Sequence, residues 1–172
     1  MIDAPFVMAP YDPNVMIAGG QEWYEAGQAW HRHVFRTGNG GGDWGENGQD
    51  LQSLILTLAF APSDANVYYV GTQNGVVWRT GNQGGSWNPT WLFAGPGHPV
   101  TRIAVDRSNS QRLFLTVGDF SVAHVWGSTD GGVTFTALAA GLPNAPSNVI
   151  VIEPNYPNTL FAGGDAGVFR ST

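Results

Sequence analysis

The segment 21–33 combines aromatic rings with carboxylates in a pattern that suits a sugar ligand. Three aromatic residues stand close in sequence to Glu22 and Glu25. Flat apolar ring faces beside hydrogen-bond acceptors complement the apolar face and the hydroxyl groups of a sugar ring. The ligand-binding residues that we predict are Trp23, Tyr24, Trp30 and His31. The alternative is that these aromatic side chains simply pack a long loop onto the rest of the protein.

Four carboxylates are candidates for the acid and base of a glycoside hydrolase. Such an enzyme places two carboxyl groups about 5–10 Å apart, flanking the bond that it cleaves. The sequence does not give that separation, and acidic residues of solvated loops are common. Catalysis is therefore the second hypothesis, behind non-catalytic binding. The candidate catalytic residues are Glu22, Glu25, Asp50 and Asp119.

The histidines offer a further possible site, for a metal. His31 and His33 alternate, so on a strand their side chains share one face, as two metal ligands would. No third ligand is evident near them, and His98 and His124 stand alone in the sequence. The chain also lacks a nucleophile elbow, a P-loop and a dinucleotide-binding fingerprint. We predict neither a metal site nor a cofactor.

Charge and hydropathy argue against several classes of partner. The net charge is -6, and the seven basic residues are arginines without a cluster that would follow a phosphate backbone. We therefore expect no nucleic acid and no anionic membrane as a partner. No stretch approaches the roughly 18 apolar residues of a membrane span, and residues 1–10 do not resemble a signal peptide. Because there is no cysteine, the compartment stays unassigned.

The elements that position these candidates form an internal repeat. A ten-residue motif occurs at residues 10–19, 62–71, 107–116 and 154–163. The copies start 52, 45 and 47 residues apart. This spacing is near that of a four-stranded propeller blade, about 40–50 residues. Each unit contains segments rich in β-branched and aromatic residues, such as 54–60, 67–71, 76–80 and 86–93. The sequence therefore predicts an all-β fold of four-stranded antiparallel blades.

A glycine-rich turn repeats in step with the first motif. It begins at residues 37, 80 and 128, and a fourth copy begins at Ser171. Such tight turns need positive φ, which glycine adopts freely, and an Asp or Asn side chain that accepts hydrogen bonds from nearby N–H groups. The aromatic residue that ends each copy is expected to insert beneath the turn. The structural residues predicted for these turns are Thr37, Asn39, Trp44, Thr80, Asn82, Trp87, Ser128, Asp130 and Phe135.

The third turn, Ser128-Thr-Asp-Gly-Gly-Val-Thr-Phe135, carries a family resemblance. Its pattern, Ser/Thr-x-Asp-x-Gly-x-Thr-Trp/Phe, resembles the Asp-box, or bacterial neuraminidase repeat, and Asn39 and Asn82 make the first two turns degenerate copies. The resemblance covers essentially the whole chain and implies a β-propeller with the boxes between the third and fourth strands of each blade. Such repeats occur in sialidases, xyloglucan hydrolases, sorting receptors and many proteins without known activity. The family is often secreted.

The resemblance also implies where a ligand would bind. In this topology the boxes lie on one face, whereas the second-to-third-strand loops and the links between blades, including segment 21–33, lie on the other, which usually binds ligands. Sialidase activity is not expected, because it needs three arginines that converge on one carboxylate. Here Arg36, Arg79 and Arg170 are spread over equivalent repeat positions. Calcium is not expected at the boxes, since each offers one acidic or amide side chain and calcium takes about six to eight oxygens.

The repeat predicts one partial propeller domain, 1–172, with three full blades and most of a fourth, at about 5–50, 51–95, 98–142 and 147–172. An open arc of blades leaves sheet edges and apolar faces exposed. We therefore expect either a homodimer that closes a ring of about eight blades or a larger propeller of which this chain is a part. The first functional hypothesis is a non-catalytic binding or scaffold module for carbohydrate or protein. The alternative is a glycoside-hydrolase-like propeller, xyloglucanase-like or sialidase-like, or a fragment of one.

Overall fold

Fifteen strands form the regular structure of the described residues, 4–27, 29–93, 97–138 and 140–171, in this computed structural model. They make four sheets of consecutive strands, which we call blades one to four. Blade one contains β1 (Phe6–Ala9), β2 (Asp12–Tyr24), β3 (Ala29–Thr37) and β4 (Gly45–Glu46). Blade two contains β5 (Ile55–Phe60), β6 (Tyr68–Thr72), β7 (Val76–Thr80) and β8 (Asn88–Trp91). Blade three contains β9 (Val100–Val105), β10 (Leu113–Val117), β11 (Val125–Ser128) and β12 (Thr136–Ala137). Blade four contains β13 (Ser147–Ile152), β14 (Leu160–Gly164) and β15 (Gly167–Arg170).

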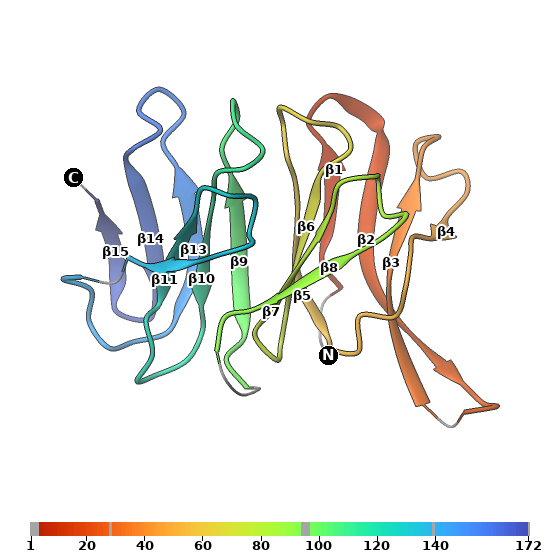
Figure 1. The fold of residues 1–172 in the computed structure, drawn as a ribbon, viewed down its shortest axis with the longest axis horizontal. Helices are drawn as coiled ribbons and strands as arrows, with labels where there is room; N and C mark the ends of the chain where they lie inside the picture. The colour runs from red at the N-terminus through yellow and green to blue at the C-terminus, as the bar shows by residue number, and fades with distance from the viewer. Residues whose placement is uncertain (1–3, 28, 94–96, 139, 172) are drawn as a thin grey trace.

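The blades stand side by side in chain order (Figure 1). Neighbouring strands within a blade pair antiparallel, which requires only short turns between them. Three blades have four strands, and blade four has three among the described residues. The predicted all-β fold, with three full blades and most of a fourth, is thus confirmed. In the described part of the chain, no helix has the length and apolar character needed to cross a membrane.

The hydrophobic core is divided among the junctions between blades. One cluster of buried side chains fills each of the three junctions. Each cluster contains a valine from the third strand of one blade and an apolar residue from the first strand of the next: Val34 with Leu58, Val77 with Ile103, and Val125 with Ile150. Because an inner blade is covered on both faces, β6 and β10 bury every residue.

The three glycine-rich turns share one hydrogen-bond pattern. In blade three, Asp130 Oδ1 accepts from the Ser128 hydroxyl at 2.8 Å and from the Thr134 N–H at 3.0 Å. Asn39 and Asn82 accept through Oδ1 from the equivalent hydroxyl and N–H groups of their own turns. Two consecutive residues in each turn have positive φ, between 60° and 94°. An asparagine therefore replaces the aspartate without loss of the bonds to Oδ1.

The aromatic residue at the end of the second and third turns packs against the preceding blade. Trp87 is buried and donates its indole N–H to the backbone oxygen of Asn47 at 3.0 Å. Phe135 packs against the cluster between blades two and three. Trp44 does not insert as expected, because the described residues contain no sheet on the other side of blade one. Its ring lies 6.2 Å from that of Phe6 and remains partly exposed.

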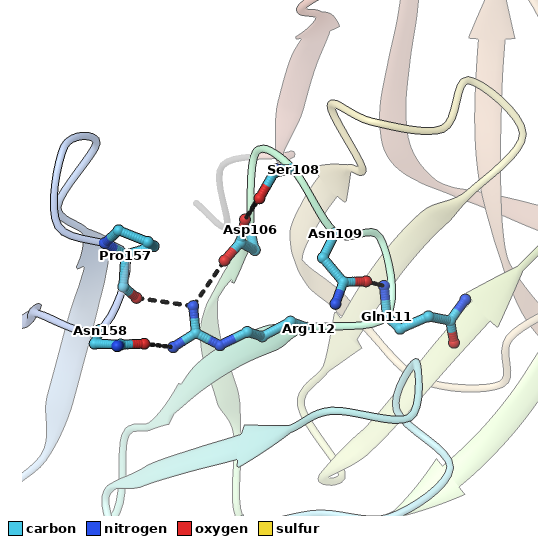
Figure 2. A network of polar contacts seen from close by, with 7 residues as sticks. All are labelled: Asp106, Ser108, Asn109, Gln111, Arg112, Pro157 and Asn158. Atoms are coloured by element: carbon cyan, nitrogen blue, oxygen red, sulfur yellow. Dashed lines mark hydrogen bonds and ion pairs between the residues drawn. The ribbon is translucent and has the colours of Figure 1, made fainter.

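Arg112 ties blade three to blade four (Figure 2). Its guanidinium donates to Asp106 Oδ2 at 2.7 Å, to the backbone oxygen of Pro157 at 2.8 Å and to Asn158 Oδ1 at 3.1 Å. Ser108 donates to Asp106 Oδ1 through its N–H and its hydroxyl. Burial alone would raise the pKa of Asp106, but the Ser108 and Arg112 donors outweigh it and hold the pKa below its ordinary value. This network fixes the two blades to each other.

Asp130 gives the glycine-rich turn of blade three a distinct pH dependence. The Thr134 hydroxyl and N–H, together with the Ser128 hydroxyl, lower the pKa of Asp130 from 3.8 to about 2. A carboxyl group whose pKa is lowered by folding stabilises the folded state above its unfolded pKa, and this contribution is lost as the pH falls through the folded pKa. Asp130→Asn lacks the charge, so we expect its midpoint of thermal unfolding to lie below that of the wild type at neutral pH. The two midpoints should converge between about pH 4 and pH 2. A constant difference over this range would contradict the assignment.

Candidate functional site

The sequence predicted a loop at residues 21–33. In the structure this segment is a β-hairpin that extends blade one. Strands β2 and β3 stay paired from Gly20↔His33 to Tyr24↔Ala29. The equivalent connection in blade two, between β6 and β7, comprises only residues 73–75. In Figure 1 the hairpin projects beyond the other blades, at the end of the molecule where the link from β8 to β9 lies. The hairpin therefore presents its side chains outside the packed blades.

Trp23 and Trp30 face each other across this hairpin. They are directly paired residues, and their ring centroids are 5.3 Å apart with the planes at 63°, an edge-to-face contact. Each tryptophan is nevertheless 46% exposed. Glu22 and Glu25 are exposed beside them, whereas the side chain of Tyr24 lies outside what the structure describes. The pair thus holds two large rings in a fixed geometry with much of their surface open to solvent.

Two histidines and an aspartate lie at the base of the hairpin. His31 and His33 share one face of β3, as the alternation predicted, and their rings stack with centroids 5.9 Å apart. His31 Nδ1 is 3.6 Å from Asp50 Oδ2, and Asp50 Oδ1 accepts from the N–H groups of Arg32 and Gln52. Burial alone would raise the pKa of Asp50, but these N–H groups and the histidines outweigh it, so the pKa is lowered. Among the described residues, no three His, Asp or Glu side chains are grouped to hold a metal ion.

A second polar pair, which the sequence did not reveal, lies in the links around blade three. His98 was expected to stand alone, but its Nδ1 lies 2.9 Å from Asp119 Oδ2. The ring of Phe93 is 4.4 Å from the ring of His98. The Phe120 N–H donates to Asp119 Oδ1 at 2.7 Å, and this bond, followed by the contact with His98, lowers the pKa of Asp119. His98 precedes β9 and Asp119 follows β10, so both residues lie at the same end of the blades. This shared placement was the signal from which their proximity could have been predicted.

The candidate catalytic carboxylates occupy three different settings. Glu22 and Glu25 stand on the exposed hairpin, Asp50 lies at its base, and Asp119 pairs with His98. The pKa values of Asp50 and Asp119 are lowered, so both are ionised at neutral pH, which suits a nucleophile more than a general base. A glycosidase also needs a general acid with a raised pKa. Neither Asp50 nor Asp119 has a raised pKa, so neither suits the role of general acid.

A cavity of about 690 Å³ lies between blades three and four. Its apolar lining includes Phe114, Leu138, Leu160 and Phe169. Phe114 holds the repeat position of Tyr69, which belongs to the cluster that Phe135 packs against in the preceding junction. The cavity therefore lies at the place where the preceding junction holds Phe135, the aromatic residue that ends its glycine-rich turn. We attribute it to the three-stranded form of blade four and not to a ligand site.

No family model and no curated protein matches this sequence. Solved structures match its fold. The GH74 enzyme of Niastella koreensis has a TM-score of 0.74 and 18% identity, over 96% of this chain and 28% of that chain. The GH74 xyloglucanase of Xanthomonas campestris has a TM-score of 0.65 and 17% identity, over 92% of this chain and 26% of that chain. YCF48 bound to D1 peptide has a TM-score of 0.65 and 13% identity, over 94% of this chain and 48% of that chain.

These similar structures are β-propeller proteins, and at this level of identity they show the fold alone. The chain spans about a quarter of the length of the two GH74 proteins and about half of the YCF48 chain. Both an enzyme class and a protein bound to a peptide share its blade arrangement. The fold therefore does not decide between catalysis and binding.

The His98–Asp119 pair can be tested by titration of the aspartate. Replacing His98 with glutamine removes the charge that a protonated imidazole places beside the carboxylate, so we expect the pKa of Asp119 to rise toward its ordinary value. It should remain lowered, because the Phe120 N–H is the larger cause of the shift. Carboxyl-carbon NMR titration measures this directly, and His31→Gln serves as the matched control, because His31 lies beside Asp50 and does not contribute to the lowered pKa of Asp119. An unchanged Asp119 pKa in His98→Gln would show that the pair does not form in solution.

Proposed function

We propose that this chain is a non-catalytic binding module whose ligand surface is the tip of the β2–β3 hairpin. The observation that carries the proposal is the Trp23–Trp30 pair, two rings held edge to face and each nearly half exposed. Trp87, in contrast, serves packing and is buried in the junction between blades one and two. Apolar surface left in water costs free energy unless a ligand covers it. The exposed pair is therefore better explained by binding than by folding.

A carbohydrate is the ligand class that fits this surface best. The tryptophan rings offer apolar faces for stacking, while Glu22, Glu25 and His31 supply hydrogen-bonding groups on the same hairpin. The fold shared with two GH74 enzymes, one of them a xyloglucanase, makes xyloglucan the first sugar to test. The fold shared with YCF48 bound to D1 peptide supports an extended protein segment as the second ligand class.

A glycoside-hydrolase-like propeller is the second candidate. The lowered pKa values of Asp50 and Asp119 supply ionised carboxylates for such a mechanism. The general acid would then have to be Glu22 or Glu25. A sialidase-like version has less support, because Arg36 points to a structural role: it donates to Gln83 of the next box at 3.4 Å.

We further propose that the three glycine-rich turns are Asp-box repeats. Their common hydrogen-bond pattern supports this, with Asn39 and Asn82 in the role of Asp130. Residues 1–172 then form one partial propeller domain with blades at about 5–50, 51–95, 98–142 and 147–172. Further blades, from a second copy or from a longer propeller, would complete the ring.

The hairpin tip can be tested with single substitutions. Replacing Trp23 or Trp30 with alanine removes one of the two indole rings of the pair. We therefore expect the affinity for xyloglucan oligosaccharides to fall at least tenfold, which corresponds to a loss of about 1.4 kcal/mol in binding free energy. Isothermal titration calorimetry measures the affinity. Trp91→Ala is the matched control, because Trp91 is also exposed but lies on β8 of blade two and is not part of the hairpin. Its affinity should equal that of the wild type.

Two outcomes would contradict this proposal. Equal weakening in Trp91→Ala would remove the hairpin as the site, and absence of binding in the wild type would remove xyloglucan as the ligand. The hydrolase alternative makes a separate prediction. Oligosaccharide would still bind, but its cleavage would be lost in a carboxylate variant, and the variants to assay are Glu22→Gln, Glu25→Gln, Asp50→Asn and Asp119→Asn.

A further inference from the structure

A groove of about 530 Å³ runs between blades three and four, along their first strands. These strands, β9 and β13, lie next to each other but belong to different sheets. Before the groove begins they are joined by the Thr101 hydroxyl, which donates to the backbone oxygen of Ser147 at 2.6 Å. At the other end of the groove the Arg112 network ties the two blades together (Figure 2). Both walls belong to neighbouring blades of the described chain, so the groove does not depend on what lies beyond blade one or blade four.

Two arginine side chains line this groove without a partner. Arg102 lies on β9 and Arg107 in the turn that follows it, and both are exposed. Neither forms a side-chain hydrogen bond or an ion pair with another described residue, in contrast to Arg112. A guanidinium group carries a permanent positive charge and several N–H donors, which suit a carboxylate. The groove therefore offers two binding points for acidic groups.

The carboxylates in the lining do not neutralise both arginines. Asp106 is paired with Arg112 at 2.7 Å. Glu153, the other acidic residue of the lining, accepts from the N–H of Asn155 at 3.2 Å. With Arg112 included, three arginines stand against two carboxylates, so the groove is positive in a chain whose net charge is -6. Charge complementarity therefore favours an acidic partner at this place.

The strands beside the groove can also bind a peptide backbone. Strands β9 and β13 each end the order of strands in their sheet, so one edge of each has no strand partner among the described residues. Such an edge presents unpaired N–H and C=O groups, to which an extended peptide can add as a further strand. Consecutive residues of both strands line the groove, as expected where a strand edge borders it.

The spacing of the two arginines fits an extended ligand. Arg102 and Arg107 are five residues apart, which is roughly 15 Å along an extended chain. Such a distance favours an elongated ligand with two acidic groups over a single small anion. The apolar part of the lining suits the side chains of that ligand and consists of Ala104, Ile152, Pro154 and Pro157 among others.

We propose that this groove binds an extended acidic peptide segment. Arg102 and Arg107 hold two of its carboxylates, and the open edge of β9 between them pairs with its backbone. A peptide fits better than an acidic sugar chain, because only a peptide carries the regular N–H and C=O groups that pair with a strand edge. The groove is a second site, and the inference is independent of the ligand proposed for the hairpin.

An NMR titration with a designed peptide tests this site. The probe has blocked ends and two aspartates five positions apart, with valine and threonine between them, and a neutral probe carries asparagine in place of both aspartates. In protein labelled with ¹⁵N, we expect the acidic probe to shift the backbone amide signals of residues 102–106 and to bind about tenfold more tightly than the neutral probe. Arg102→Gln and Arg107→Gln each remove one contact with a carboxylate, so each should weaken binding of the acidic probe about threefold. Because both side chains are exposed, the amide spectra of the free variants should otherwise match that of the wild type.

Arg170→Gln is the matched control, because Arg170 is also exposed but does not line the groove. Its affinity for the acidic probe should equal that of the wild type. Absence of binding to the wild type, equal affinity for the two probes, or equal weakening in Arg170→Gln would each overturn the proposal. Inorganic phosphate that displaces the acidic probe at equal concentration would also overturn it, because the site would then take a single small anion. Shifts confined to residues 21–33 would place the peptide on the hairpin, which would refute this inference and leave the proposed hairpin surface intact.

Discussion

Each sheet in this protein has two apolar faces, and the fold depends on covering each face with the next sheet. The core is not one central cluster but three clusters, one for each junction. Stability in such a row is mainly a sum over neighbouring units. The glycine-rich turns of blades two and three serve the same purpose, because each fixes the chain that places an aromatic side chain, Trp87 or Phe135, onto the preceding blade. Arg112 adds a polar tie at the third junction.

This constraint also explains where function can lie. Side chains inside a junction are buried against the neighbouring blade, so a ligand can contact only the parts of the chain outside the junctions, such as the turns and links at the ends of the strands. At one end lie the glycine-rich turns, whose polar side chains are used in hydrogen bonds within each turn. At the other, blade one extends a hairpin that the other blades lack, and the Trp23–Trp30 pair stands on it. The His98–Asp119 pair lies in links of the same kind.

The sequence predicted the repeated features well, because they are set by local rules. Strand β7 has the predicted bounds, Val76–Thr80, and Asn39 and Asn82 of two glycine-rich turns make the hydrogen bonds expected of them. The hairpin at 21–33 was missed, because strands that are exposed on both faces carry no apolar alternation. The exposure of Trp44 was missed for a different reason. Its turn resembles that of Trp87, and only the presence of a neighbouring blade distinguishes the two.

The pairing of His98 with Asp119 shows the remaining limit. The two residues are 21 positions apart, and their contact depends on how two links bend over the same strand ends. Repeat periodicity places the links but not the side chains in them. The separation of candidate catalytic carboxylates is undetermined by sequence for the same reason.

The indole N–H signals of the tryptophans give the most direct test of the binding surface. Each of the seven tryptophans reports on a different place in the fold. On titration with xyloglucan oligosaccharide, the account predicts shifts in the NMR signals of Trp23 and Trp30, with the signals of Trp78 and Trp87 unchanged. Trp126 lies against Phe93, beside the His98–Asp119 pair. Shifts confined to Trp126 would contradict the account and place the site in the links of blade three.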